Sequence, residues 1–587
     1  MDRVTDGFRF VVVADSHIRP TDHEIDAYPS NALMVGRNEF IVDLCNRIDA
    51  RFVVHLGDIV HPLPVEDTHL ESIRLAKGVY RGLRHPIHFV AGNHDVGDKP
   101  NALVAVPAVD EGNYAVYEEA WGPSFYSFDV EGCHFVVIDT QLMNSGLDRE
   151  RLQRTWLESD LGVAGESSKR IFVFSHYPPF IRDRDENEHY DNIGEPARTW
   201  LLDLLAHHDV EAVFSGHVHN FLYNRHESTE LYVAPSTAFV RPDYAELASI
   251  PPMAENGRDD PPKLGVVVVD IGAEGHDTQP IRSFGSVDVS VPLPIDLDAV
   301  LRPGWESPIG VTLRHEWAGV TGFPTAGLDE FNRKLVRNDA AVLALWEARI
   351  RDIRVPLADL ATQAKADRVR HLTGKGMRFS VVSAGVPDHR SMEMVRSNST
   401  SIDRWEIIVP PASFAASLAS IESAPVPDVE IAIAPIVPVG TSSADLHHFV
   451  AAGFSLTDDA DLARWLDIDT NRAIGSLVFR VPWNAHVSDS PKRARAIANE
   501  SGRTATLVID LPRAGESTVL DDDDAVSNRV ADVVQAAALE PTVAVFLDGF
   551  VDHDRGYYPR HGLIDRAFNP RPAFYRLIKE SAGIGNL

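Results

Sequence analysis

Five short polar motifs stand directly after apolar, strand-like runs in the first half of this chain. In chain order they are Asp15-Ser16-His17, Gly57-Asp58, Gly92-Asn93-His94-Asp95, His176 and Gly216-His217-Val218-His219. The runs before them are Phe8–Ala14, Phe52–Leu56, His88–Ala91, Ile171–Ser175 and Ala212–Ser215. Because the carboxyl ends of strands in an α/β sheet face the ligand crevice, polar side chains from all these strands are expected to meet at one rim.

The residue types in these motifs suit hard to borderline divalent cations. Imidazole and carboxylate groups are ligands for manganese, iron or zinc, and the motifs hold no thiolate that would favour softer metals. Two ions a few ångströms apart can clamp a phosphoryl group, and a carboxylate can bridge them. Each motif alone is also typical of an ordinary polar turn. Their joint occurrence in one order, each after a strand, favours a two-metal site.

The rest of the first half alternates β-rich runs with helix-like stretches such as Asn31–Ala50. Further strands are expected at Phe125–Val130, Cys133–Asp139, Tyr232–Ala234 and Gly265–Asp270. Strands covered by helices on both sides indicate an α/β layered domain. Near Gln279–Pro294 the chain becomes rich in Ser, Val and Pro, which places a domain boundary at about residue 290, between a domain 1–290 and a domain 291–587.

The second half has its own alternation of strands and helices. Strands are expected at Ile309–Leu313, Asp352–Val355, Phe379–Ser383, Trp405–Val409, Val429–Ala434, Leu477–Val481, Thr506–Asp510 and Val543–Leu547. Helices are expected at Leu328–Arg349, Pro356–Leu372, Ala412–Ile421, Asp459–Asp467, Pro491–Glu500 and Asp524–Ala538. This order predicts a (β/α)8 barrel, with a three-layer open sheet as the alternative and His447–Phe454 as a further strand candidate. The acidic run Asp521–Asp524 is interpreted as a solvated helix start.

The order of the five motifs resembles the calcineurin-like metallophosphoesterase superfamily, whose pattern is DxH, GD, GNH(D/E), H and GHxH. The resemblance covers about residues 8–285 and implies a four-layer α/β/β/α domain. It implies one metal held by Asp15, His17, Asp58 and His219. It implies a second metal held by Asp58, Asn93, His176 and His217, so that Asp58 bridges. It also implies that His94 acts on the transferring phosphoryl group or the leaving oxygen, with Asp95 orienting His94.

The expected cofactors are therefore two divalent metal ions, with Mn, Fe and Zn as the candidates. A hydroxide held between two cations is a nucleophile at neutral pH, because bound water has its pKa lowered from 15.7 to about 7 in favourable cases. This hydroxide would attack phosphorus in line. The metals and His94 would offset the developing charge, and protonation of the leaving group would make His94 a general acid.

Some segments resemble one subgroup more closely. Trp121–Phe128 and Asp139-Thr140-Gln141 are similar to a small calcineurin-like group that includes a human protein phosphatase-type member. The acidic insert Ile181–Asn192 matches that group too, and is interpreted either as a lid beside the metals or as a solvated loop. Side chains that could line the cleft, or be ordinary loop residues, are His23, Arg37, His61 and Asn220.

The C-terminal segment 543–580 resembles the last strand and helix of barrel-type glycoside hydrolases. Such enzymes need one carboxylate after strand four and one after strand seven. The expected fourth strand ends Val409-Pro410-Pro411 without an acid, and the seventh ends at Asp510. The barrel is therefore interpreted as non-catalytic or as shaping the substrate site. Residues expected near its rim that could bind a sugar or polyol are His315, Glu316, Trp483, Asn484, Asp548 and Tyr557.

Composition limits the partners. The 587 residues carry a formal net charge of −31, which disfavours a nucleic-acid partner because a polyanion would be repelled. Cys45 and Cys133 lie in hydrophobic contexts and offer no disulfide framework. The start Met1–Gly7 has no signal-peptide pattern, and no apolar run has the length of a membrane span, so a cytoplasmic location without membrane partners is expected.

The leading hypothesis is an enzyme that hydrolyses a phosphomonoester or phosphodiester of a small molecule, which could carry a sugar or polyol. One alternative is a bifunctional phosphoesterase and glycoside hydrolase, in which Asp510 and Glu316 would serve the barrel. Another is a protein phosphatase, and a third is a metal-binding sensor without turnover. A sensor has no need of His94, so the complete motif set favours an enzyme. Homo-oligomerisation is left open by the sequence.

Overall fold

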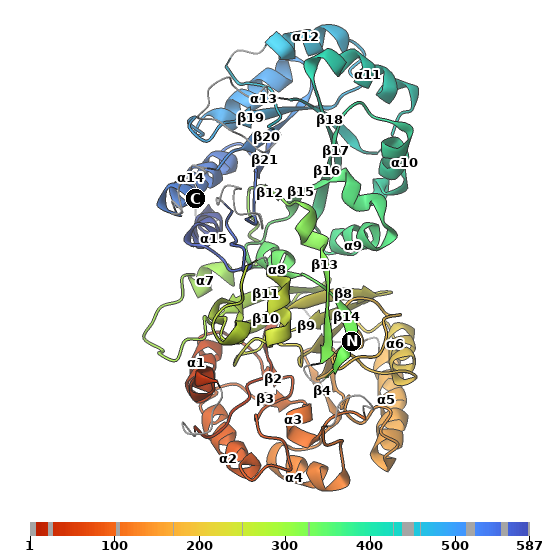
Figure 1. The fold of residues 1–587 in the computed structure, drawn as a ribbon, viewed down its shortest axis with the longest axis vertical. Coiled ribbons are helices and arrows are strands. Elements are labelled where there is room, and N and C mark those ends of the chain that lie inside the picture. Colours follow the sequence, from red (N-terminus) through yellow and green to blue (C-terminus); the bar gives the residue numbers. More distant parts are fainter. Residues whose placement is uncertain are drawn as a thin grey trace. The chain divides into compact units, whose positions relative to one another are not determined.

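The computed structural model describes residues 7–21, 28–100, 106–167, 169–248, 250–326, 329–426, 428–436, 451–457, 460–511, 523–552 and 562–584 (Figure 1). The chain divides into two compact units. The first comprises Met1–Leu293 with Val320–Leu343, and the second comprises Pro294–Gly319 with Ala344–Leu587. The chain therefore enters the second unit at Pro294, returns to the first unit for Val320–Leu343, and continues in the second unit from Ala344.

The first unit contains two sheets. Their strand orders are β11-β10-β1-β2-β3 and β4-β5-β6-β7-β9-β8. The strands are β1 (Phe8–Val13), β2 (Val53–His55), β3 (Ile87–Phe89), β4 (Tyr126–Val130), β5 (Cys133–Val137), β6 (Arg170–Ser175), β7 (Ala212–Ser215), β8 (Leu222–His226), β9 (Thr229–Val233), β10 (Gly265–Ile271) and β11 (His276–Arg282). Strands β1, β2 and β3 pair in parallel, as do β5, β6 and β7, so the ends of each trio point to one edge.

An aromatic layer lies between the two sheets. The ring of Phe10 on β1 meets Phe135 on β5 edge-on at 5.6 Å, and meets Phe174 on β6 and Phe214 on β7 at 5.8 Å each. The neighbouring positions on the same strands, Val136 and Val173 among them, point the other way into a separate cluster. This period-two alternation of Phe and Val gives the second sheet two buried faces.

Helices cover the outer faces of both sheets. Those of the first unit are α1 (Met34–Asn46), α2 (His69–Tyr80), α3 (Asn93–Val96), α4 (Glu111–Trp121), α5 (Asp148–Glu166) and α6 (Ala197–His207). Leu161 of α5 and Leu201 of α6 pack on the valine face of the second sheet. Ile73 of α2 and Tyr114 of α4 pack on residues that follow the strands of the first sheet. The expected four-layer α/β/β/α order is confirmed.

The second unit is a closed barrel of eight parallel strands, as the sequence predicts. Around the barrel the strands are β12 (Gly310–Thr312), β15 (Asp352–Pro356), β16 (Arg378–Ala384), β17 (Arg404–Val409), β18 (Glu430–Pro435), β19 (Ser476–Val481), β20 (Thr504–Ile509) and β21 (Ala544–Leu547). Its helices are α7 (Leu297–Val300), α9 (Gln363–Thr373), α10 (His389–Ser397), α11 (Phe414–Ser423), α12 (Ala460–Ile468), α13 (Ser490–Glu500), α14 (Asp523–Ala538) and α15 (Pro572–Ile584). Parallel pairing closes through β12 and β21, which excludes the open-sheet alternative.

One expected helix is wrong. The segment Leu328–Arg349 contains the strand β14 (Asp329–Arg337) before a shorter helix, α8 (Ala340–Glu347). Strand β14 pairs antiparallel with β13 (Val320–Ala326), and this hairpin lies in the first unit. Its Lys334 and Val336 are buried while Leu335 is half exposed, an alternation set by packing on a surface. Tertiary packing here outweighs the good intrinsic helix propensity of the Lys, Leu and Arg residues.

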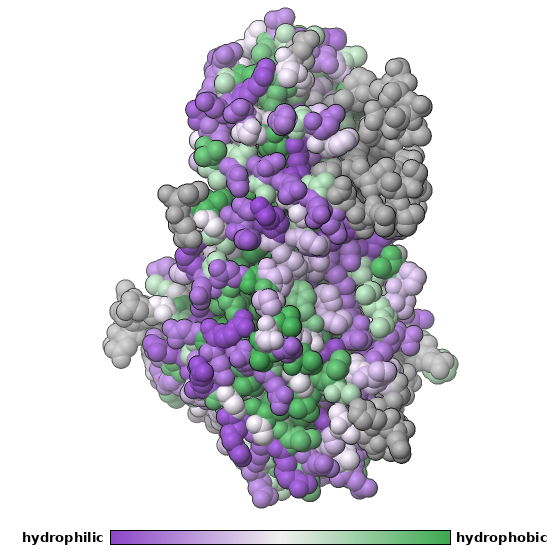
Figure 2. All heavy atoms as spheres, turned by 90° about the vertical axis from the view of Figure 1, so that its left-hand side faces the viewer, coloured by the Kyte–Doolittle hydropathy of each residue, from purple (hydrophilic) through white to green (hydrophobic). Residues whose placement is uncertain are grey.

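Other expectations fall partly outside the described residues. His447–Phe454 is described only from residue 451, and Asp521 and Asp522 lie outside the described residues, where α14 begins at Asp523. Both cysteines are free and buried. None of the described helices is long and apolar enough to span a bilayer. On the face shown in Figure 2, hydrophilic residues are widespread and groups of hydrophobic residues are interspersed among them.

Candidate metal centre

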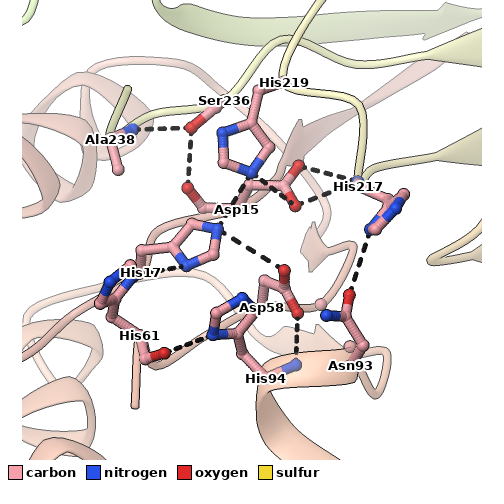
Figure 3. Close-up of polar contacts among 12 residues, drawn as sticks. Asp15, His17, Asp58, His61, Asn93, His94, His217, His219, Ser236 and Ala238 are labelled. Carbon is pink, nitrogen blue, oxygen red and sulfur yellow. Dashed lines mark hydrogen bonds and ion pairs between the residues drawn. The ribbon is translucent and has the colours of Figure 1, made fainter. Parts of the chain in front are cut away.

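The seven residues expected to bind metal meet at one edge of the first unit. They come from the segments directly after β1, β2, β3, β6 and β7. All are at most 3% exposed: Asp15, His17, Asp58, Asn93, His176, His217 and His219. Figure 3 shows side chains that point toward a common space, namely those of Asp15, His17, Asp58, Asn93, His217 and His219. Buried polar groups normally have hydrogen-bond partners or bind an ion, so this cluster at the ends of separate strands is a candidate ligand site.

The first group consists of Asp15, His17, Asp58 and His219, whose ligand atoms lie within 4.8 Å of one another. Nε2 of His17 is 3.0 Å from Nε2 of His219 and 3.5 Å from Oδ2 of Asp58. Oδ1 of Asp15 is 3.5 Å from Nε2 of His219. The four atoms therefore converge as the ligands of a single ion would.

The second group shares Asp58 with the first. Asp58, His176 and His217 place ligand atoms within 4.8 Å of one another. Oδ1 of Asn93 lies 3.0 Å from Nε2 of His176 and 3.1 Å from Nδ1 of His217. Oδ1 of Asp58 is 3.4 Å from Nε2 of His176, while Oδ2 of Asp58 faces the first group. The two oxygens of Asp58 thus serve different groups, as the bridging role requires.

Hydrogen bonding on the far side of the imidazole rings tests whether a cation fits. Nδ1 of His176 faces the carbonyl oxygen of Leu56 at 2.8 Å, and Nδ1 of His219 faces that of Phe239 at 2.9 Å. A carbonyl oxygen only accepts, so both Nδ1 atoms carry protons, and each ring, once it has no proton on Nε2, turns the lone pair of that nitrogen inward. Those lone pairs face oxygen lone pairs of Asp58, Asn93 and Asp15. A space surrounded by acceptors fits divalent cations.

The same arrangement perturbs the titration of the centre. Burial disfavours the imidazolium of His176, but the charge of Asp58 and the hydrogen bond to it raise the pKa of His176 to about 9. Burial also opposes ionisation of Asp58, yet His176 and His94 hold the pKa of Asp58 well below its ordinary value. The carboxylate at the centre of the site therefore remains an anion that attracts positive charge.

The backbone is strained at five of the seven positions. Non-glycine residues with left-handed φ are Asp15 (54°), His17 (45°), Asp58 (53°), His217 (68°) and His219 (58°). Such conformations cost about 1–3 kcal/mol each and persist where the surroundings impose them. Gly92 permits the close approach, because a Cβ atom there would lie 2.0 Å from the amide nitrogen of Asp58.

The expected partnership of His94 and Asp95 is not found. The Nδ1 atom of His94 donates to the carbonyl oxygen of His61, not to Asp95. The carboxylate of Asp95 instead accepts from the amides of Ile59 (3.1 Å), Val60 (3.3 Å) and Gly92 (2.9 Å). At the start of α3 the Asp95 carboxylate pairs with the amide of Gly92 and with two amides of the neighbouring loop, rather than with the ring of the adjacent His94. Asp95 therefore holds the loop that carries Asp58.

Other cleft candidates have mixed outcomes. His61 is close to the centre, with its Nδ1 3.2 Å from Nδ1 of His17. Arg37 is buried for structural reasons, donating to the carbonyl oxygen of Ala238 and to Asp259 at 2.7 Å. Asn220 is half-buried and accepts from the amide of Phe221 at 3.1 Å. His23 lies outside the described residues.

The acidic insert 181–192 contributes directly to the site. Asp191 is fully buried, and Tyr190 accepts a 3.2 Å hydrogen bond from Nδ2 of Asn93. The ring of Tyr190 lies 4.7 Å from that of His217. A freely solvated loop is therefore excluded for this end of the insert. Sequence reasoning also missed Ser236, whose hydroxyl donates to the carbonyl oxygen of Asp15 at 2.8 Å (Figure 3).

The carboxylates of the barrel are committed to arginines. Asp510 pairs with Arg480, which also donates to Asp548 at 2.5 Å. Glu406, inside the fourth strand, accepts from Arg354 at 2.7 and 2.9 Å. Burial would raise the pKa of Asp548, but Arg480 and Arg314 hold it far below its ordinary value. A glycosidic general acid needs a raised pKa, which the pairing of Asp548 with Arg480 opposes.

A pocket of about 590 Å³ lies at the carboxyl ends of the barrel strands, with Arg354, Arg480 and Asp548 in its lining. Trp483 and Asn484 are exposed and do not line this pocket in the described part of the chain. The side chains of His315 and Glu316 and the whole of Tyr557 lie outside the described residues. Of the six expected rim residues, Asp548 is thus placed in a pocket.

Comparison with known proteins agrees with this centre. The family model of calcineurin-like phosphoesterases matches residues 8–221. Serine/threonine-protein phosphatase CPPED1 of Danio rerio is 32% identical over 190 residues, which are 31% of this chain and 59% of that protein. CPPED1 of Homo sapiens is 29% identical over 205 residues, 33% of this chain and 62% of that protein. Purple acid phosphatase 23 of Arabidopsis thaliana is 29% identical over 154 residues, 24% of this chain and 30% of that protein.

The matched region contains the strands from β1 to β7 and all seven residues of the two ligand groups. The chain spans about three fifths of the length of the CPPED1 relatives, and the barrel lies outside the family match. The order of motifs, the layered fold and the converging ligand atoms agree with the family match. Residues 8–221 of this chain form a calcineurin-like metallophosphoesterase domain.

Proposed function

We propose that this protein is a phosphoesterase that uses two divalent metal ions to hydrolyse a phosphomonoester or phosphodiester of a small molecule. The observation that carries the proposal is the pair of acceptor-lined groups that share Asp58. Asp15, His17, Asp58 and His219 would hold one ion. Asp58, Asn93, His176 and His217 would hold the other. Manganese, iron and zinc are the candidates, because imidazole and carboxylate ligands suit all three.

The bound ions would supply Lewis-acid stabilisation and an activated water for attack on phosphorus. Side chains of the protein would hold the ions and supply the proton for the leaving group. Asp58, with one oxygen toward each group, would hold both ions. Nδ1 of His94 donates to the carbonyl oxygen of His61, which fixes the ring and leaves Nε2 as the atom that faces the substrate. His94 is half-buried while the ligands are buried, so it is accessible to a leaving group. Protonated at Nε2, it would act as the general acid.

A protein phosphatase activity is the second candidate, and it rests on the name of the CPPED1 relatives. The net charge of −31 disfavours polyanionic partners and is neutral toward a small phosphoester. A glycoside hydrolase activity of the barrel is not part of the proposal, because Asp510 and Glu406 are both paired with arginines. The barrel would then bind ligands or shape the substrate site without cleaving a glycoside.

The test begins with the metal-stripped full-length protein. Titration with Mn²⁺ or Zn²⁺ should give two ions per chain, and activity on p-nitrophenyl phosphate or bis-p-nitrophenyl phosphate should appear with the metal. Asp58→Asn should abolish both. A phosphoserine peptide assayed beside the small esters separates the two candidate functions. A chain that binds no divalent metal and turns over no phosphoester with Mn²⁺ would overturn the proposal.

A further inference from the structure

A lysine from far along the chain is buried in the first unit. Lys334 lies on β14 of the hairpin, and its side chain is 0% exposed. Its Nζ atom donates to Asp191 at 2.5 Å and to Asp243 at 2.8 Å. An ammonium group taken out of water is costly unless it is paired and hydrogen-bonded. The position of the Lys334 ammonium group is therefore fixed by the carboxylates of Asp191 and Asp243.

The hairpin is held in place by contacts other than Lys334. Arg337 donates to the carbonyl oxygen of Tyr223 at 2.7 Å and to Asn224 at 2.8 Å. Asp339 accepts from the amide of Tyr223 at 2.9 Å. Phe323 of β13 packs edge-on against Tyr244 at 5.2 Å, in the short helix Pro242–Leu247. Removal of the Lys334 charge should leave the hairpin attached.

Asp191 connects Lys334 to the metal centre. One of its oxygens accepts from Lys334 and from the hydroxyl of Tyr244 at 2.8 Å. Its other oxygen accepts from Arg241 and lies 3.7 Å from Nε2 of His217. Arg241 also donates to Asp243 at 2.9 Å, so two cations and two anions form a closed, balanced network. The orientation of the Asp191 carboxylate is fixed from all sides.

Within the part of the chain that the structure describes, the ring of His217 lacks a hydrogen-bond partner on the side that faces Asp191. Its Nδ1 atom points to Oδ1 of Asn93, toward the second ligand group. Its Nε2 atom is buried and has no hydrogen-bond partner among the described residues, and the carboxylate of Asp191 is the group that it faces. A histidine that gives one nitrogen to a metal carries a proton on the other, and a carboxylate behind the ring fixes that tautomer and the ring's orientation.

We propose that Lys334 is a positioning residue of the second metal subsite, acting through Asp191 on His217. The inference rests on the proposed function, because it concerns the ion that His217 would hold. Lys334 neutralises and orients the carboxylate, and the carboxylate orients the ring. The hairpin β13–β14 lies within the sequence of the barrel and outside the residues 8–221 that match the family. Through Lys334 it nevertheless contributes to the phosphoesterase centre.

The test compares Lys334→Met with Arg333→Met in the full-length, metal-stripped protein. Arg333 is the preceding residue on β14 and is exposed, so its replacement removes the same charge from the same strand. Calorimetric titration with Mn²⁺ should show two ions bound to the wild type and to Arg333→Met. In Lys334→Met the first ion should bind normally and the second about 10–100-fold more weakly, the range typical for loss of an outer partner of a ligand.

A double-mutant cycle keeps the inference testable if Lys334→Met proves poorly folded. Asp191→Asn should weaken the second ion to a similar extent, and adding Lys334→Met to it should cause little further loss, because both act through one contact. Equal affinities in Lys334→Met and Arg333→Met, or fully additive losses in the double variant, would overturn the inference. Failure of the wild type to bind two ions would instead overturn the proposed function.

Discussion

The amide nitrogen of His94 donates a 2.9 Å hydrogen bond to Oδ1 of Asp58. The residue proposed to act on the leaving group therefore also positions, through its backbone, the carboxylate shared by both ligand groups. Its ring and its amide have separate tasks, and these can be separated by substitution.

His94→Ala removes the ring and keeps the amide. We expect activity to fall by about 10²–10⁴-fold, the usual contribution of a general acid. The number of bound ions and their affinities should stay at the wild-type level, because Asp58 keeps its hydrogen bond. Metal titration beside steady-state kinetics checks both parts. A loss of metal binding would show that the ring is a ligand, which contradicts the proposed role.

Gly92→Ala should disrupt the centre. A Cβ atom at this position would lie 2.0 Å from the amide nitrogen and 2.3 Å from Oδ1 of Asp58, so the Asp58 loop must move. We expect loss of both ions with lowered thermal stability. Gly78→Ala is the matched control, because nothing lies within 4 Å of its Cβ position in α2. Alanine there should be neutral or stabilise by up to about 1 kcal/mol.

Glu406→Gln should destabilise the barrel without affecting phosphoester hydrolysis. Glu406 and Arg354 have side chains that are 1% and 6% exposed and pair through two hydrogen bonds. Breaking a buried pair from one side leaves an uncompensated charge and costs about 3–5 kcal/mol. Denaturant unfolding measures the change. Release of sugar from a panel of aryl glycosides by the wild type would instead revive the bifunctional alternative.

Glu211 gives the first unit an acid-sensitive contact. Burial opposes its ionisation, but hydrogen bonds from His276 and Arg170 outweigh burial and lower the pKa of Glu211 to about 2. The stabilisation is complete above the unfolded pKa near 4.3 and is lost as pH falls toward 2; it amounts to about 3 kcal/mol at most. Unfolding free energies of the wild type and Glu211→Gln should differ at pH 7 and approach each other at pH 3. A difference independent of pH would refute this.

Short sequence patterns were enough to predict the sheet edge at which the candidate metal ligands meet. Asp15, Asp58 and His176 each come directly after a strand, so their convergence was expected from the rule that strand ends share an edge. The eight barrel strands were predicted from a different local pattern, because they are short apolar runs, most of them separated by helix-like segments. The positions of Lys334 and Asp191 depend on a contact between residues distant in sequence, which no local pattern records.

The orientation of His94 shows the same limit at short range. Adjacency to Asp95 suggested a partner, but which groups meet depends on the turn between Gly92 and Val96. There the carboxylate of Asp95 meets backbone amides of the neighbouring loop, and the ring of His94 meets the carbonyl oxygen of His61. Ser236 was missed, and Tyr190 was covered only as part of the insert 181–192, because hydroxyl groups in loops carry no spacing signal.

The hairpin β13–β14 has a consequence for synthesis of the protein. The chain passes between the two units three times, after Leu293, Gly319 and Leu343. Domains generally fold as units while the ribosome extends the chain at about 5–20 residues per second. The first unit cannot be complete before its residues Val320–Leu343 are made, and these residues follow β12 of the barrel in the chain. Part of the barrel is therefore synthesised before the last two strands of the first unit, so folding of the first unit can be completed only after synthesis of the barrel has begun.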